Sequence, residues 1–134
     1  SGSLGKKLHL KVGDLSDYSK IPSVSYEASL KEVILEISEK RLGATVVKKN
    51  GKLCGLITDG DIRRVLEKHE NINGLTANNI MTHKPVKVDE DMLAYDALKL
   101  MQSKKINHIL VMGKDNNYKG LIHILDFIKE GLNG

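Results

Sequence analysis

Four residues suited to binding a small anionic molecule stand together at Thr58-Asp59-Gly60-Asp61. They lie between an apolar run and a stretch with apolar residues at helical spacing, so a strand should end and a helix begin here. The free amides of a helix N-terminus attract anions such as phosphate, and Gly60 lets a ligand approach the backbone. Thr58 adds a hydroxyl, and Asp61 adds a carboxylate able to accept hydrogen bonds from a pair of ribose hydroxyls.

Two arginines, Arg63 and Arg64, follow this motif, and one of them could point back at a bound phosphate. A purely structural interpretation stands beside the ligand-binding one. In it, Asp59 or Asp61 only caps the helix, with Asp59 a plausible N-cap, and the arginines are solvated. The residue pattern alone leaves both interpretations open.

A related motif occurs in Ile122-His123-Ile124-Leu125-Asp126. Asp126 keeps the carboxylate, while His123 replaces the hydroxyl. Histidine can donate a hydrogen bond, stack on a base or change charge near neutral pH. The structural alternative is a packed histidine at a strand end. His108 is expected to occupy the place in this second copy that Thr45 occupies in the first.

The two motifs belong to a longer internal repeat. Gly55-Leu56-Ile57 returns 65 residues later, and upstream Pro22 matches Pro85 with an offset of 63. The slip falls in a turn, where insertions are tolerated. We expect two copies of one unit of about 60 residues, each marginal alone, packed with a cleft between them that is the place to seek function.

Each copy is predicted to have the order β-α-β-β-α. Ser29 and Glu32 form a capping box that opens the first helix, and Gly43 closes it. Asn50-Gly51 indicates a tight hairpin. The remaining expected elements are strands at 44–48, 52–58, 85–88, 109–112 and 118–124, a helical turn at 77–81, and a last helix at 126–132.

Composition narrows the function classes. The chain has 134 residues, 40% hydrophobic, with a net charge of +4 and both signs interspersed. One Phe, four Tyr and no Trp offer few surfaces on which bases could stack, which argues against nucleic acid. Cys54, the single cysteine, is expected as a buried strand thiol in a reducing compartment.

Several other classes find no support in the residue pattern. No apolar stretch approaches the roughly 20 residues that span a bilayer, and no signal peptide is visible. Histidine and cysteine spacing indicates no metal site, and no residues are arranged as a catalytic apparatus. We therefore expect no catalytic residues, no metal and no obligatory cofactor in this chain.

These motifs resemble the CBS domain. Gly55-x-x-Thr58-x-x-Asp61 is similar to its phosphate-and-ribose motif, and Asn79-Ile80-Met81-Thr82 to the start of a second copy. The resemblance covers residues 14–134 and implies an α/β (α+β) fold of two β-α-β-β-α CBS units packed with pseudo-two-fold symmetry. His123 departs from the general pattern of the family.

A narrower resemblance is to the C-terminal half of bacterial arabinose-5-phosphate isomerases. It rests on residues 42–47, 55–64, 97–101 and 120–123, and His at position 123 is usual there. It implies that residues 1–13 are a linker or the end of an upstream SIS domain, followed by CBS domains at 14–74 and 75–134. The isomerase active site would lie upstream.

This resemblance implies a regulatory module of a cytoplasmic enzyme that converts ribulose 5-phosphate to arabinose 5-phosphate for Kdo and lipopolysaccharide synthesis. A nucleotide or nucleotide sugar such as CMP-Kdo is the implied ligand. The implied binding residues are Thr58, Asp59, Gly60, Asp61, Arg63, Arg64, His108, His123 and Asp126, with the two histidines on the opposite wall. The chain would form a homodimer, and the full-length protein a tetramer. The alternative is a purely structural dimerisation module.

Overall fold

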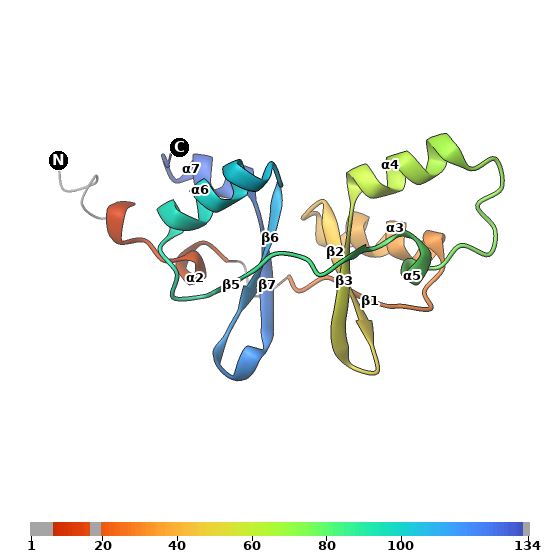
Figure 1. Ribbon diagram of the computed structural model, residues 1–134, viewed down its shortest axis with the longest axis horizontal. Helices are drawn as coiled ribbons and strands as arrows, with labels where there is room; N and C mark the ends of the chain where they lie inside the picture. The colour runs from red at the N-terminus through yellow and green to blue at the C-terminus, as the bar shows by residue number, and fades with distance from the viewer. Residues whose placement is uncertain (1–6, 17–19, 133–134) are drawn as a thin grey trace. The chain divides into compact units, whose positions relative to one another are not determined.

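The structure is a computed structural model that describes residues 7–16 and 20–132 (Figure 1). The chain divides into two compact units. One, here called the central unit, is Pro22–Pro85. The other, here called the composite unit, joins residues 1–21 to residues 86–134. Each unit combines a sheet with helices, so the predicted mixed α+β class is confirmed.

The central unit contains a four-stranded sheet in the order β1-β2-β3-β4. β1 is parallel to β2, and the other pairs are antiparallel. Asn50 and Gly51 have φ angles of 53° and 76°, which confirms the predicted tight hairpin between β2 and β3. The elements are β1 (Ser23–Ser25), α3 (Leu30–Lys40), β2 (Ala44–Lys49), β3 (Lys52–Thr58), α4 (Asp59–Lys68), α5 (Ala77–Ile80) and β4 (Thr82–His83).

Helix α3 begins as its sequence predicts and ends earlier than predicted. The Ser29 hydroxyl accepts a hydrogen bond from the Glu32 amide at 3.2 Å. The helix stops at Lys40 because Arg41 adopts the left-handed conformation, with φ of 60°, and donates its amide to a carbonyl of the last turn. The expectation that Gly43 closes this helix is wrong. The positive φ of Gly43 instead belongs to the turn that leads into β2.

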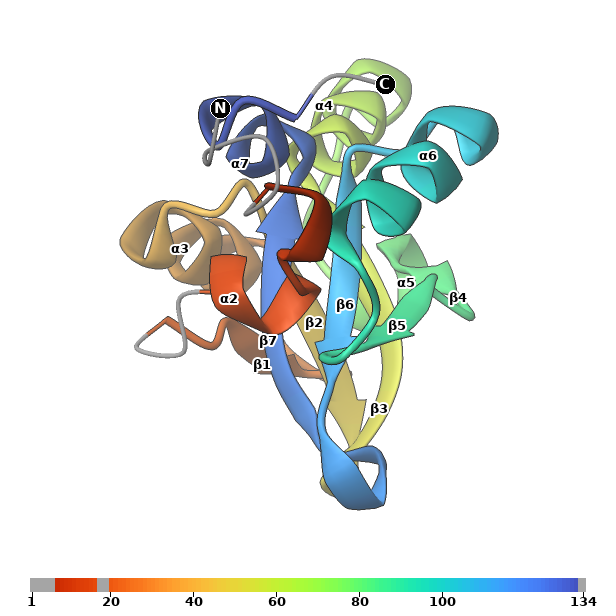
Figure 2. The same ribbon diagram turned by 90° about the vertical axis from the view of Figure 1, so that its left-hand side faces the viewer.

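The composite unit contains a three-stranded sheet in the order β5-β6-β7. Figure 2 turns this unit toward the viewer, with α6 and α7 beside the strands. Its core includes the fully buried Leu98, Met101, Ile122 and Phe127. The last helix ends at Lys129, three residues before the predicted end. The elements are α2 (Val12–Leu15), β5 (Lys87–Asp89), α6 (Ala94–Lys104), β6 (His108–Met112), η1 (Lys114–Asn116), β7 (Tyr118–His123) and α7 (Ile124–Lys129).

Equivalent hydrogen bonds in the two units show which residues of the two copies correspond, and they correct the predicted repeat. Carbonyl oxygens of Pro22 and Val86 accept from the equivalent amides of Val46 and Leu110. Pro22 therefore corresponds to Val86, at an offset of 64, and the predicted match of Pro22 with Pro85 is wrong by one residue. Both hairpins also carry a register shift at equivalent points.

The short helices α2 and α5 occupy equivalent places in the two sequence copies. Each packs against elements of the other copy. The amide of Val12 donates to Met92, and the amide of Ala77 donates to Ala28, both at 2.8 Å. Helix α5 opens the second sequence copy, yet it belongs to the central unit. Helix α2 opens the first sequence copy, yet it belongs to the composite unit. The compact units therefore exchange the opening segments of the two sequence copies.

This exchange accounts for the N-terminal segment. Val12 falls within the range predicted as a linker, yet its side chain is fully buried in the composite core. Four residues are too few for a firm hydrophobic period, so only the tertiary contact reveals their role. The predicted limits 14–74 and 75–134 divide the chain by sequence copy, which is a different division from the compact units.

We expect Val12→Ala to lower the free energy of unfolding by about 2 kcal/mol, because it removes buried methyl groups and leaves a cavity. Leu8→Ala is the control, since the Leu8 side chain is 50% exposed and should change stability by less than about 0.5 kcal/mol. Urea unfolding followed by circular dichroism measures both. Equal effects of the two variants would show that α2 is not part of the composite core.

Candidate functional site

The corner between β3 and α4 is held by two reciprocal hydrogen bonds. The Thr58 hydroxyl accepts from the Asp61 amide at 3.2 Å, and Asp61 Oδ2 accepts from the Thr58 amide at 2.9 Å. This is a capping box. Thr58 is therefore the N-cap, and the expectation that Asp59 fills this role is wrong by one residue. The amide of Asp59 is bonded instead to the carbonyl of Gly43 at 3.0 Å.

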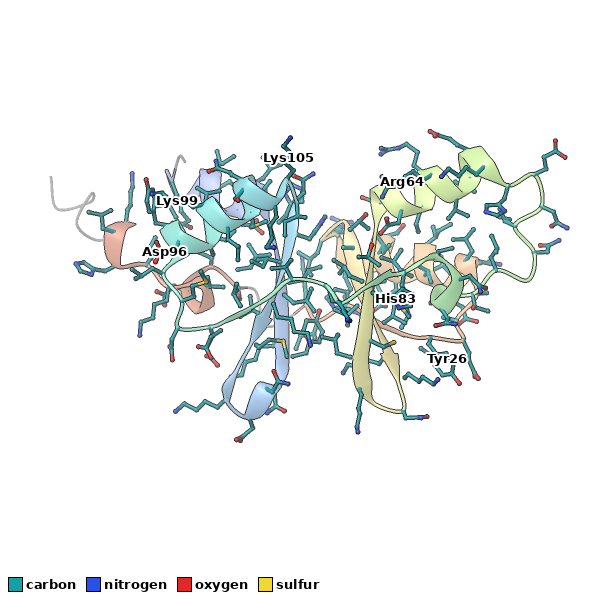
Figure 3. The ribbon with its side chains drawn as sticks, viewed as in Figure 1. Tyr26, Arg64, His83, Asp96, Lys99 and Lys105 are labelled. Carbon is teal, nitrogen blue, oxygen red and sulfur yellow. The ribbon has the colours of Figure 1, made fainter. Side chains whose placement is uncertain are left out.

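The second oxygen of Asp61 meets Arg64. Arg64 Nη2 donates to Asp61 Oδ1 at 2.5 Å, in an ion pair whose aspartate side chain is 13% exposed and whose arginine is 60% exposed. Figure 3 labels Arg64 on α4. A Cβ placed on Gly60 would lie 3.3 Å from Arg64 Nη1, so the guanidinium lies close over that glycine. Among the residues the structure describes, the Gly60 amide has no hydrogen-bond partner.

The structure therefore brings together four of the predicted residues, Thr58, Gly60, Asp61 and Arg64. The side chains of Asp59 and Arg63 are exposed. The corner offers an open backbone donor, a guanidinium and an oriented carboxylate within one helical turn. Those groups suit a ligand that has both an anionic group and hydroxyls.

The equivalent corner of the composite unit lies between β7 and α7. His123 Nδ1 accepts from the Leu125 amide at 3.0 Å, and Asp126 Oδ2 accepts from the His123 amide at 3.0 Å. The imidazole thus takes the place of the threonine hydroxyl as helix cap. Because Nδ1 accepts, the neutral ring carries its proton on Nε2 in this arrangement.

His108 lies against His123. The two residues are directly paired between β6 and β7, and their rings meet edge to face with centroids 4.9 Å apart. In the central unit the residue paired with Thr58 is Ala44, not Thr45. The predicted equivalence of His108 and Thr45 is therefore wrong, and Ala44 is the counterpart of His108.

The capping role of His123 was absent from the sequence predictions, although a signal for it was available. His123 and Asp126 have the same spacing as Thr58 and Asp61, which is the spacing of a capping box. Imidazole Nδ1 is a less common cap acceptor than a hydroxyl, so the pattern is easily missed.

Cys54 lies on β3, four residues before Thr58 in the chain. Its side chain is partly buried, and Sγ is 3.9 Å from the Met81 sulfur. Burial raises the pKa of the Cys54 thiol, and the nearby Lys49 charge lowers it by a smaller amount. The thiol is therefore a weak nucleophile near neutral pH.

The described residues, 7–16 and 20–132, hold neither a metal-binding cluster nor a membrane-spanning helix. In that part of the chain, no three side chains of histidine, cysteine, aspartate or glutamate are grouped to hold a metal ion. No helix there combines the length and the apolar character needed to cross a membrane.

Comparison with protein families finds the CBS domain model twice, at residues 12–68 and 77–133. Both matches begin at a short helix, α2 or α5, as the equivalence of those helices requires. The chain is 38% identical over 133 residues to an arabinose 5-phosphate isomerase, KdsD, of Yersinia pestis. That alignment covers 98% of the chain but only 40% of the relative.

Solved structures share the fold at low sequence identity. The CBS domain of a bacterial CNNM/CorC family Mg²⁺ transporter in complex with ATP has a TM-score of 0.81 and 21% identity, covering 96% of this chain and 92% of that one. A CBS domain protein, PAE2072, from Pyrobaculum aerophilum complexed with AMP has a TM-score of 0.78 and 22% identity, covering 87% and 88%.

The raised pKa of Cys54 predicts slow alkylation by iodoacetamide that still accelerates above pH 9, where an ordinary thiol begins to level off. The sign follows because a raised pKa leaves less thiolate at any given pH. Lys49→Ala removes the charge that favours the thiolate and should slow the reaction further. Mass spectrometry between pH 7 and 10, with N-acetylcysteine as reference, measures the rate, and a plateau below pH 9 would contradict the prediction.

Proposed function

The chain belongs to the CBS domain family and carries two copies of that domain, and from this premise we propose that it binds a nucleotide or nucleotide sugar at the Thr58–Asp61 corner. The observation that carries the proposal is the arrangement of the four grouped residues. In it, Asp61 is already oriented by the capping box, so it can accept from ribose hydroxyls without reorganising the helix.

Arg64 supplies the anion-binding part of the proposed site. Its guanidinium is mostly exposed, so it can turn from Asp61 toward a phosphate at little cost in desolvation. The phosphate would then lie near the unpartnered amide of Gly60, at the positive end of α4. Arg63, the other predicted arginine, would meet further anionic groups, and Asp59 would border the site. ATP and AMP are the ligands named for two solved structures with this fold, which supports the same ligand class.

We further propose that the chain is the regulatory part of an arabinose-5-phosphate isomerase, located after an upstream SIS domain that carries the active site. The similarity to KdsD supports this, although the chain spans only 40% of that relative. The whole enzyme would convert ribulose 5-phosphate to arabinose 5-phosphate for Kdo synthesis in the cytoplasm. CMP-Kdo is a sensible feedback ligand because it combines a ribose, a phosphate and an acidic sugar.

The corner of the composite unit would make a second set of ligand contacts. His108 and His123 present imidazole rings there, and Asp126 presents a carboxylate. Imidazole Nε2 can donate to a phosphate or sugar oxygen, and the ring face can stack on a base. We assign these residues to ligand binding as part of the same proposal.

A second candidate function is dimerisation, with tetramers in the full-length protein. Helices α4 and α7 each expose apolar side chains: Leu66 on α4 is 50% exposed, and Leu125 and Ile128 on α7 are 52% and 47% exposed. Such residues on a helix favour a partner helix over water. This function is compatible with ligand binding and requires a separate test.

We expect Asp61→Ala to weaken nucleotide binding about 10- to 150-fold, because it removes a charge-assisted hydrogen bond. Thr58→Val should weaken it less, by about 5-fold. Lys114→Ala, in η1 of the other unit, is the control and should bind as the wild type does. Calorimetric titration of CMP-Kdo, CMP, AMP and ATP measures all four proteins.

Because Asp61 also caps α4, each variant is first checked for folding by its thermal unfolding curve, and binding is compared at a temperature where all are folded. If no nucleotide binds below about 1 mM, or if Asp61→Ala binds like the wild type, the corner is not the ligand site. Asp61 would then be a helix cap only, and dimerisation would be the favoured function.

Light scattering should give twice the mass of the chain at a chain concentration of about 100 μM. That concentration is well above common dimer dissociation constants. Leu66→Glu and Leu125→Glu should each shift the mass toward that of one chain, because a charge would be buried at the contact. Leu35→Glu is the matched control, since Leu35 on α3 is 58% exposed and lies outside the proposed contact. A wild-type mass of one chain at this concentration would refute the dimer.

A further inference from the structure

The cap of α7 depends on a titratable ring. His123 Nδ1 accepts the amide of Leu125 at 3.0 Å, so that nitrogen must lack a proton for the hydrogen bond to exist. Imidazole is the side chain whose ordinary titration lies closest to physiological pH. A proton on Nδ1 converts the acceptor into a donor that faces another donor, so the capping bond is lost.

The surrounding charges are few and of mixed sign. His108 on β6 lies edge to face with the ring, and Asp126 on α7 accepts from the amide of His123. Helix α6, which also packs against α7, ends at Lys104 and continues into Lys105, labelled in Figure 3. At the far end of α7, Lys7 reaches Gly131.

The central unit shows the same corner without this sensitivity. There the cap is the Thr58 hydroxyl, which does not titrate, and the residue paired with it is Ala44. The two corners share two other features, because each has a capping aspartate and each has a first helical amide bonded to a preceding carbonyl. The cap acceptor therefore differs between the two corners, an imidazole in one and a hydroxyl in the other.

We propose that His123 makes the start of α7 a proton-sensitive switch, closed when its ring is neutral and released when the ring is protonated. Release frees the first turn of a short helix whose Phe127 is fully buried in the composite core. Acid would thus loosen the composite unit selectively and leave the central unit unchanged. This inference does not rest on nucleotide binding, so the two proposals can fail separately.

The test is a nuclear magnetic resonance titration of the 134-residue chain from pH 8 to pH 5. At pH 8 the ring of His123 should carry its proton on Nε2 alone. As His123 gains a proton, the Leu125 amide should shift with the same midpoint and lose about 10-fold in protection from hydrogen exchange, after correction for intrinsic exchange. The Asp61 amide, which the Thr58 hydroxyl caps at the other corner, should show no such transition.

Three variants assign the effect. His123→Thr installs the cap of the central unit and should abolish the Leu125 transition. His108→Ala installs the counterpart of Ala44, keeps the acceptor and should retain the transition. His83→Ala removes an exposed histidine on β4 and should behave as the wild type does.

Three results would overturn the proposal. The first is a Leu125 amide shift that stays constant while His123 titrates in the wild type. The second is a Leu125 amide shift that still follows pH in His123→Thr. The third is a neutral ring protonated on Nδ1 in the wild type, which needs no variant and remains decisive if His123→Thr fails to fold.

Discussion

The two corners where a returning strand becomes a helix depend on one reciprocal pair of side chain–backbone hydrogen bonds. In the central unit, Thr58 and Asp61 each satisfy an amide of the other, which fixes the direction in which α4 leaves β3. The same bonds use one oxygen of Asp61 and leave the other directed at the exposed Arg64. A residue needed for the fold is thereby held ready for a ligand, without strain in the backbone.

This double use explains why the structural and ligand-binding interpretations of Asp61 need not compete. A carboxylate oxygen has more than one lone pair, so Asp61 can keep the cap while a ligand replaces Arg64 as the partner of Oδ1. The site would then exchange one charge-assisted hydrogen bond for another, and the displaced guanidinium would be available for a phosphate. In the composite unit, the imidazole of His123 serves as the cap acceptor in place of a hydroxyl and accepts from the second amide of the helix.

The sequence predicted the local features well, because short-range chemistry determines them. Asn50 and Gly51 demanded a tight hairpin, and Ser29 supplied a helix cap. The side chain that caps the helix at each corner was harder to predict. The N-cap is Thr58 and not Asp59, which differ by one position in the chain. The sequence does not show that the amide of Asp59 bonds to the carbonyl of Gly43, and this contact makes Asp59 the first residue of the helix.

The features that sequence reasoning missed are non-local. The burial of Val12 depends on a contact with residues more than 70 positions away in the chain, which no local period encodes. The counterpart of His108 depends on strand register, and a one-residue error in the repeat offset was enough to assign it to Thr45 instead of Ala44. The position of Arg64 over Gly60 likewise required the side-chain conformation.

The central claim is that the first turn of α4 is a ligand-binding corner. A map of amide chemical shifts on adding AMP to the ¹⁵N-labelled chain tests this most directly, because it locates binding without altering any residue. We expect the largest shifts at the amides of Asp59, Gly60 and Asp61, with smaller ones toward Arg64. Shifts centred elsewhere, for example on the Asn50–Gly51 hairpin, or no shifts at all at millimolar AMP, would contradict it.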